Sequence, residues 1–204
     1  MRHASLAANL MVAACLIGCT EPPPWPVQAA SSAEPAPRFE TGRVSLSRED
    51  QQRAATARLL PGDARSLLAQ EPMRHGDFAW NEEGVPEGRV TIWVDLKRQS
   101  VSVFRAGHEI GTAVILYGAP SHASPRGTFP ILRKTADYHS RSYDAPMPHS
   151  LFLTEDGVAL HGSDVEVRKA THGCIGLPEA FAAKLFDVAE IGDEVTIVQS
   201  DSTV

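Results

Sequence analysis

The alternation of apolar and polar residues that begins after Arg89 is the feature that most constrains how this chain folds. Residues 90–94 (VTIWV) and 100–104 (SVSVF) are rich in β-branched and aromatic residues and flank the polar turn at 95–98, which is typical of a β-hairpin. Further strands are predicted at 110–117, 128–132, 151–153, 158–161 and 194–198. The turn pair Asp156-Gly157 supports a second hairpin. The sequence therefore predicts a mostly β (α+β) domain, an antiparallel sandwich or barrel-like fold with few short helices.

Helical signals are confined to two regions. Residues 47–70 begin with Ser47 as a cap and with Glu49 and Asp50 in the first turn, and Pro61-Gly62 divides a first helix from a second, short one at 63–70. Residues 178–188 form an amphipathic pattern with proline in its first turn. The first region carries no group of residue types suited to catalysis, so we interpret it as packing or spacing structure.

The N-terminus has the pattern of an export signal. Arg2 precedes an apolar run at residues 6–18, which is too short to span a membrane but suits the apolar part of a secretory signal. The run ends in LIGC (16–19), which resembles a bacterial lipobox and predicts lipidation of Cys19. An ordinary cleaved signal is the alternative. Either interpretation predicts an exported protein of the cell envelope or periplasm, and lipidation would anchor it to a membrane.

A proline-rich stretch follows the signal. Residues 21–37 contain six prolines among seventeen residues, a composition that favours an extended tether over a packed core. Carried through residues 19–45, such a tether would reach about 80 Å. The net charge of −6 and the lack of a basic run argue against a nucleic-acid partner.

Cysteine usage directs attention to one thiol. The chain contains Cys15, Cys19 and Cys174, so removal of the signal and lipidation of Cys19 would leave Cys174 unpaired. A lone cysteine is most often a small buried residue, yet a free thiol in an exported protein is exposed to oxidation. His161, at the end of a predicted strand, could hold Cys174 as a nucleophile if the fold brings the two together.

Two interpretations of the residues around Cys174 remain open. Gly162 and Gly173 allow close backbone approach, and amides near Gly173-Cys174 could bind a developing oxyanion. His161, His172 and Cys174 could instead bind zinc, although a fourth ligand with suitable spacing is missing. We therefore expect no metal and no other cofactor.

Four motifs occur in an order that resembles a known family. They are G-A-P (118–120) continuing to S-P-R-G-T-F (124–129), Y-D-A-P-M-P (143–148), A-L-H-G (159–162) and T-H-G-C (171–174). With them, residues 88–200 resemble the L,D-transpeptidase catalytic domain, the YkuD family of peptidoglycan cross-linking enzymes. The expected organisation is a lipoprotein signal (1–18), a tether (19–45), a helical spacer (46–87) and this domain.

The resemblance implies a cysteine acyl-transferase that acts on peptidoglycan stem peptides without a cofactor. We also expect the protein to be a monomer. Cys174 would attack a stem tetrapeptide and release its terminal D-alanine, and an amine of a second stem would complete a 3→3 cross-link. His161 would act as base and then acid, oriented by the carbonyl of Gly162. His172 and Gly173 would shape the oxyanion site, whose amides come from residues 172–174.

The same resemblance places Tyr143 and Met147 in a loop that walls the substrate groove. The chain departs from the family at Gly176, where arginine or asparagine is usual, and it lacks an arginine commonly found near Phe152. We expect Arg168, together with Lys169, to supply part of that positive charge. A hydrolase with the same site (an L,D-carboxypeptidase or lipoprotein-detaching enzyme) and a non-catalytic wall-binding lipoprotein remain alternatives.

Overall fold

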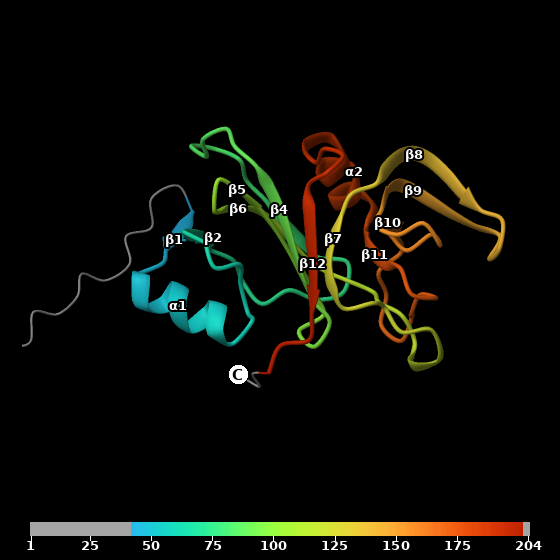
Figure 1. Ribbon diagram of the computed structural model, residues 1–204, viewed down its shortest axis with the longest axis horizontal. Coiled ribbons are helices and arrows are strands. Elements are labelled where there is room, and N and C mark those ends of the chain that lie inside the picture. The colour runs from blue at the N-terminus through green and yellow to red at the C-terminus, as the bar shows by residue number, and fades with distance from the viewer. Residues whose placement is uncertain (1–41, 202–204) are drawn as a thin grey trace, which may run out of the picture. The chain divides into compact units, whose positions relative to one another are not determined.

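The computed structural model describes residues 42–201, which form two sheets and two α-helices (Figure 1). The helices are α1 (Arg48–Thr56) and α2 (Glu179–Val188), with a 3₁₀ turn η1 (Pro120–His122). The strands are β1 (Arg43–Ser45), β2 (Ser66–Leu68), β3 (Phe78–Trp80), β4 (Val90–Asp95), β5 (Ser100–Arg105), β6 (His108–Val114), β7 (Gly127–Pro130), β8 (Arg133–Ser140), β9 (Ala145–Phe152), β10 (Ala159–Ser163), β11 (Ile175–Pro178) and β12 (Glu194–Val198).

The two sheets are open and mixed. The larger sheet has the order β1-β2-β6-β5-β4-β12-β7, with β3 also paired to β6, and the smaller has the order β11-β10-β9-β8. Most neighbours are antiparallel, but β2–β6, β4–β12 and β10–β11 are parallel. The predicted mostly β fold with few helices is confirmed. No barrel closes among the described strands, and the sheets are not purely antiparallel.

One hydrophobic core joins the sheets through α2. Buried apolar side chains from the larger sheet, from β9–β11 and from α2 form a single cluster. Phe181 of α2 is fully buried and meets the rings of Trp80 and Phe78 edge-on, with centroids 5.3 and 5.9 Å away. Figure 1 shows α2 at the place where the two sheets come together. The predicted helix at 178–188 is confirmed, with Pro178 at its N-cap.

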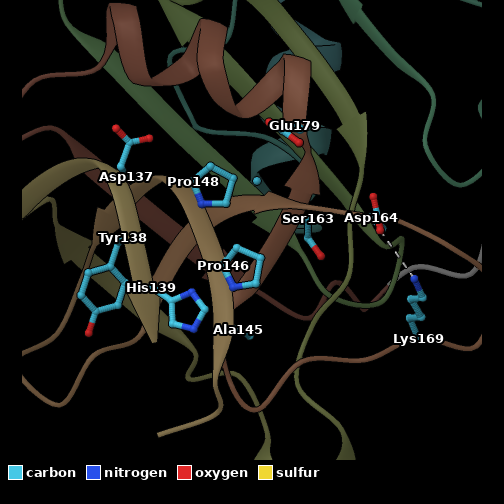
Figure 2. A pocket seen from close by; sticks show the side chains of 11 residues that line it. Asp137, Tyr138, His139, Ala145, Pro146, Pro148, Ser163, Asp164, Lys169 and Glu179 are labelled. Atoms are coloured by element: carbon cyan, nitrogen blue, oxygen red, sulfur yellow. Dashed lines mark ion pairs between the residues drawn. The ribbon is translucent and has the colours of Figure 1, made fainter. Parts of the chain in front are cut away.

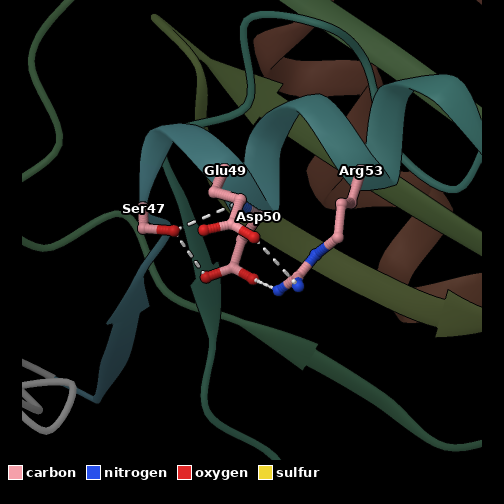
Figure 3. Close-up of polar contacts among 4 residues, drawn as sticks. All are labelled: Ser47, Glu49, Asp50 and Arg53. Atoms are coloured by element: carbon pink, nitrogen blue, oxygen red, sulfur yellow. Dashed lines mark hydrogen bonds and ion pairs between the residues drawn. The ribbon is translucent and has the colours of Figure 1, made fainter. Parts of the chain in front are cut away.

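The segment before the larger sheet is only partly helical. Helix α1 begins at the predicted cap, where the Ser47 hydroxyl accepts a hydrogen bond of 3.1 Å from the Asp50 amide, and Arg53 pairs with Glu49 and Asp50 (Figure 3). The helix ends at Thr56. The second helix predicted at 63–70 is wrong, because residues 66–68 form strand β2 between β1 and β6.

Strand β1 lies within the stretch assigned to the tether, so that assignment is wrong for residues 43–45. Arg43 is buried, and its guanidinium donates to the backbone carbonyls of Glu109 and Asn81. The buried carboxylate of Glu109 in turn accepts a hydrogen bond of 2.8 Å from the Leu68 amide. Residues 43–80, which we call the N-terminal segment, are therefore built into the sheet.

The predicted export signal and Cys19 lie outside the described residues. Within residues 42–201, neither helix has the length and apolar character needed to cross a bilayer.

Candidate active site

His161 and Cys174 lie on the same face of neighbouring strands. In the parallel pair β10–β11, Leu160 is opposite Ile175 and His161 is opposite Gly176. Leu160 and Ile175 are fully buried in the core, so the residues on either side of them face away from it. Cys174 directly precedes Ile175 and shares the face of His161. The sheet register thus brings together two residues thirteen positions apart in the sequence.

The His161 ring is oriented by its neighbour in the chain. Nδ1 lies 2.8 Å from the carbonyl oxygen of Gly162. Because a carbonyl can only accept, Nδ1 carries the proton and Nε2 keeps a free lone pair. Burial lowers the pKa of His161, and the hydrogen bond to Gly162 opposes this in part. The imidazole is therefore neutral near pH 7, the form that can accept a proton.

The Cys174 thiol is half-buried and also neutral at rest. Sγ lies 3.7 Å from the carbonyl oxygen of Gly157. Burial raises the pKa of the thiol, a backbone hydrogen bond with Ala159 lowers it, and the charge of Asp156 raises it further. Within residues 42–201 no hydrogen bond joins Sγ to the His161 ring. This arrangement favours proton transfer during nucleophilic attack over a thiolate formed in advance.

Residues 171–176, which we call the Cys174 loop, are held by contacts from the stretch after β6. The carbonyl of Cys174 accepts hydrogen bonds from the hydroxyls of Thr171 (2.5 Å) and Ser124 (3.4 Å). The Ser124 hydroxyl also accepts one from the Gly118 amide at 2.9 Å. These residues belong to the sequence motifs, but the motifs do not predict this supporting role, because Ser124 and Cys174 are fifty positions apart in the sequence.

Gly176 occupies a closely packed position. Its amide and carbonyl both bond the backbone of Leu116 at 2.9 Å. A Cβ on Gly176 would lie 3.2 Å from Cβ of Ser163 and 3.3 Å from Cβ of Leu116. Any larger residue here would have to displace one of these two neighbours. The space around position 176 therefore fits glycine, although the family usually has arginine or asparagine there.

Tyr143 and His172 stack at the edge of the site. Tyr143 lies in the turn between β8 and β9, and its ring is 4.2 Å from that of His172 at an angle of 15°. The His122 ring meets His172 edge-on at 5.3 Å. The stack joins the tip of the β8–β9 hairpin to the Cys174 loop.

Met147 forms an apolar wall near the thiol. It is buried in a small cluster with Phe152 and Ala159, and Tyr138 and Cys174 pack against that cluster. The structure thus brings both predicted groove residues to the Cys174 loop, but the loop expected for both is wrong for Met147, which lies in strand β9.

A cavity of about 680 Å³ opens beside Gly162 (Figure 2). It is predominantly acidic, and its charged or titratable lining residues are Asp137, Tyr138, His139, Asp164, Lys169 and Glu179. Lys169 lies 3.2 Å from Glu166 and 4.0 Å from Asp164, so nearby carboxylates offset its charge. Arg168 is exposed, with no ion pair among the described residues.

The zinc alternative has no support in the side-chain arrangement. Among residues 42–201, no three His, Cys, Asp or Glu side chains gather as metal ligands do.

The comparison with protein families agrees with the fold and the motifs. Residues 89–197 match the YkuD family model, described as the L,D-transpeptidase catalytic domain. This match covers more than half of the chain, and the chain belongs to that family.

Individual relatives carry the same family name. L,D-transpeptidase 1 of Mycobacterium tuberculosis is 28% identical over 134 residues, which cover 57% of this chain and 53% of the relative. The chain therefore spans about half the length of this relative.

Two solved structures share the fold. An L,D-transpeptidase in complex with imipenem is 25% identical with a TM-score of 0.50, and the match covers 53% of this chain and 58% of that one. An L,D-transpeptidase from Stackebrandtia nassauensis is 24% identical with a TM-score of 0.51, over 58% and 60% of the two chains.

Proposed function

We propose that this protein is a peptidoglycan L,D-transpeptidase with Cys174 as nucleophile and His161 as general base and acid. The observation that carries the proposal is the placement of both side chains on one face of β10–β11, with Nδ1 of His161 held by the Gly162 carbonyl. That hydrogen bond leaves Nε2 free to take the thiol proton.

The reaction proceeds in two acyl transfers. Sγ of Cys174 bonds to the carbonyl carbon before the terminal D-alanine of a stem tetrapeptide, and its proton passes to His161. The C–N bond then breaks, and His161 returns the proton to the departing amine. An amine of a second stem attacks the thioester, loses its proton to His161 and releases the thiol. The product is a 3→3 cross-link.

The surrounding residues have supporting roles in this proposal. Amides of residues 172–174 bind the oxyanion, and the positive φ of Gly173 (111°) suits the sharp turn they require. Tyr143 and Met147 bound the substrate groove, and Arg168 contributes positive charge at its edge.

Incubation with disaccharide-tetrapeptides, followed by mass spectrometry, tests the activity. Wild-type protein is expected to form a dimer with loss of one alanine, and Cys174→Ala to form none. Tripeptide alone would identify a hydrolase instead. No product from wild-type protein, with no adduct of a carbapenem such as imipenem at Cys174, would overturn the proposal in favour of a wall-binding protein.

We also propose that the protein is exported and lipid-anchored at Cys19, where it acts as a monomer in the cell envelope. The apolar run and the LIGC sequence support the anchor. Membrane fractionation of wild type and Cys19→Ala tests it. Release of the variant into the soluble envelope fraction is expected, and identical fractionation of the two proteins would contradict the anchor.

A further inference from the structure

Arg133 stands at one end of a row of residues that crosses the smaller sheet. Arg133 on β8 is opposite Phe152 on β9, and Phe152 is opposite Ala159 on β10. Since Leu160 is opposite Ile175, the next position in this row is Cys174. Residues directly opposite one another share a face of the sheet. Arg133 therefore lies on the same face as the thiol.

The Arg133 side chain leans toward Cys174. Its guanidinium carbon is 3.5 Å from the centroid of the Phe152 ring and 5.7 Å from that of Tyr138. Strand β8 is the edge of the sheet, so an arginine above Phe152 extends inward over β9. Nη1 donates to the Thr135 hydroxyl at 3.1 Å.

This guanidinium has no carboxylate partner among residues 42–201, and it is exposed. A planar, permanently charged guanidinium is the side chain best suited to bind a carboxylate through two parallel hydrogen bonds. Stacking on Phe152 holds it in place before any ligand arrives.

The distance to the thiol suits a group one residue beyond the scissile bond. A charge above β9 stands two strands from Cys174, roughly 10 Å in backbone spacing. A cysteine side chain, an attacked carbonyl carbon and one further residue of about 3.8 Å together span a comparable length.

The charged side chains of the cavity beside Gly162 are less suitable for an anion. On β8, Asp137 follows Arg133 by four residues and lines the acidic cavity beside Gly162 with Asp164 and Glu179. Carboxylates outnumber the cationic side chains that line that cavity, so the cavity disfavours an anion. Lys169 also lines it and is already paired with Glu166.

We propose that Arg133 binds the terminal carboxylate of the donor stem, the carboxylate of the D-alanine that leaves. The proposal rests on the proposed L,D-transpeptidase function. In this proposal Arg133 of β8 supplies a positive charge that is missing at Gly176, where the family usually has arginine or asparagine.

The test compares two donors, a disaccharide-tetrapeptide and the same compound with its terminal D-alanine converted to D-alaninamide. Wild-type protein is expected to acylate at least tenfold faster with the free carboxylate, and Arg133→Gln to reduce this preference to less than threefold. Arg133→Lys should keep an intermediate preference. Arg141→Gln, which removes an exposed charge from the turn of the same hairpin, should keep the full preference. Alkylation of Cys174 by neutral iodoacetamide should be equal in all four proteins.

The outcomes separate this proposal from the function on which it rests. If wild-type protein accepts neither donor, the transpeptidase function fails. If wild-type protein accepts both donors equally, or Arg133→Gln keeps the preference, the role of Arg133 is wrong and the function stands. If Arg168→Gln abolishes the preference while Arg133→Gln keeps it, the carboxylate is bound from the Cys174 loop instead.

Discussion

The Cys174 loop and the N-terminal segment are attached to their sheets in different ways. The loop is held by neutral contacts, from the Ser124 and Thr171 hydroxyls to the Cys174 carbonyl and from the Leu116 backbone to Gly176. The N-terminal segment is held by a buried guanidinium, that of Arg43. Changes in the first region should therefore alter reactivity at Cys174, and changes in the second should alter the free energy of unfolding.

The largest expected effect is on reactivity alone. His161→Gln removes the proton acceptor, so acylation of Cys174 by a tetrapeptide donor should fall about 10²–10⁴-fold. The urea midpoint should change little, because the neutral ring makes one hydrogen bond, to Gly162. Mass spectrometry of the acyl-enzyme over time measures the rate. An unchanged rate would mean that another group takes the proton.

The second effect falls on stability alone. Arg43→Ala removes the charged donor to two backbone carbonyls, which should lower the free energy of unfolding by about 3 kcal/mol. The acylation rate of the folded protein should remain that of wild type. Urea denaturation measures the first quantity, with the exposed Arg48→Ala as matched control. If Arg43→Ala lowered the acylation rate and left the free energy of unfolding unchanged, the contrast between the N-terminal segment and the Cys174 loop would be wrong.

Gly118 is the position where both quantities should change. A Cβ at Gly118 would lie 2.0 Å from the carbonyl oxygen of His122 and 2.7 Å from the amide of Ser124, both backbone atoms that cannot move freely. Gly118→Ala should cost about 2 kcal/mol of stability. It should also slow acylation, because Ser124 supports the Cys174 carbonyl. Gly62→Ala, with open space around the new Cβ, should leave both unchanged.

The smallest effect concerns the pH dependence of the thiol. Because burial raises the pKa of Cys174 and lowers that of His161, neither group is charged at neutral pH. Alkylation by iodoacetamide, which needs the thiolate, should rise with pH beyond about 8.5, the ordinary thiol value. Peptide mass spectrometry at Cys174 follows the reaction. A plateau of high reactivity between about pH 5 and 7 would instead indicate a thiolate–imidazolium pair.

Strong local sequence patterns were sufficient to predict part of the fold. Strands β4 and β5 follow from alternation around a polar turn, and α2 follows from its amphipathic period and its proline. These elements bury one face completely, so the core requires the pattern that the sequence displays.

Other elements have no such signal. Strand β8 (RKTADYHS) is mostly exposed or half-buried at a sheet edge, and its pairing with β9 defines it. Strand β2 has three residues, and its bonds to β1 and β6 override the helical propensity of that stretch.

Among candidate site residues, the sequence by itself determined the residue types: one unpaired thiol, a histidine directly before each of Gly162 and Gly173, and a glycine at 176. Only the tertiary structure decided that Cys174 and His161 share a face, that Ser124 supports the loop, and that Arg133 leans toward the thiol. These relations depend on strand register and on contacts between distant segments. Local hydrophobic patterns carry information about burial, whereas they carry almost none about which strand lies beside which.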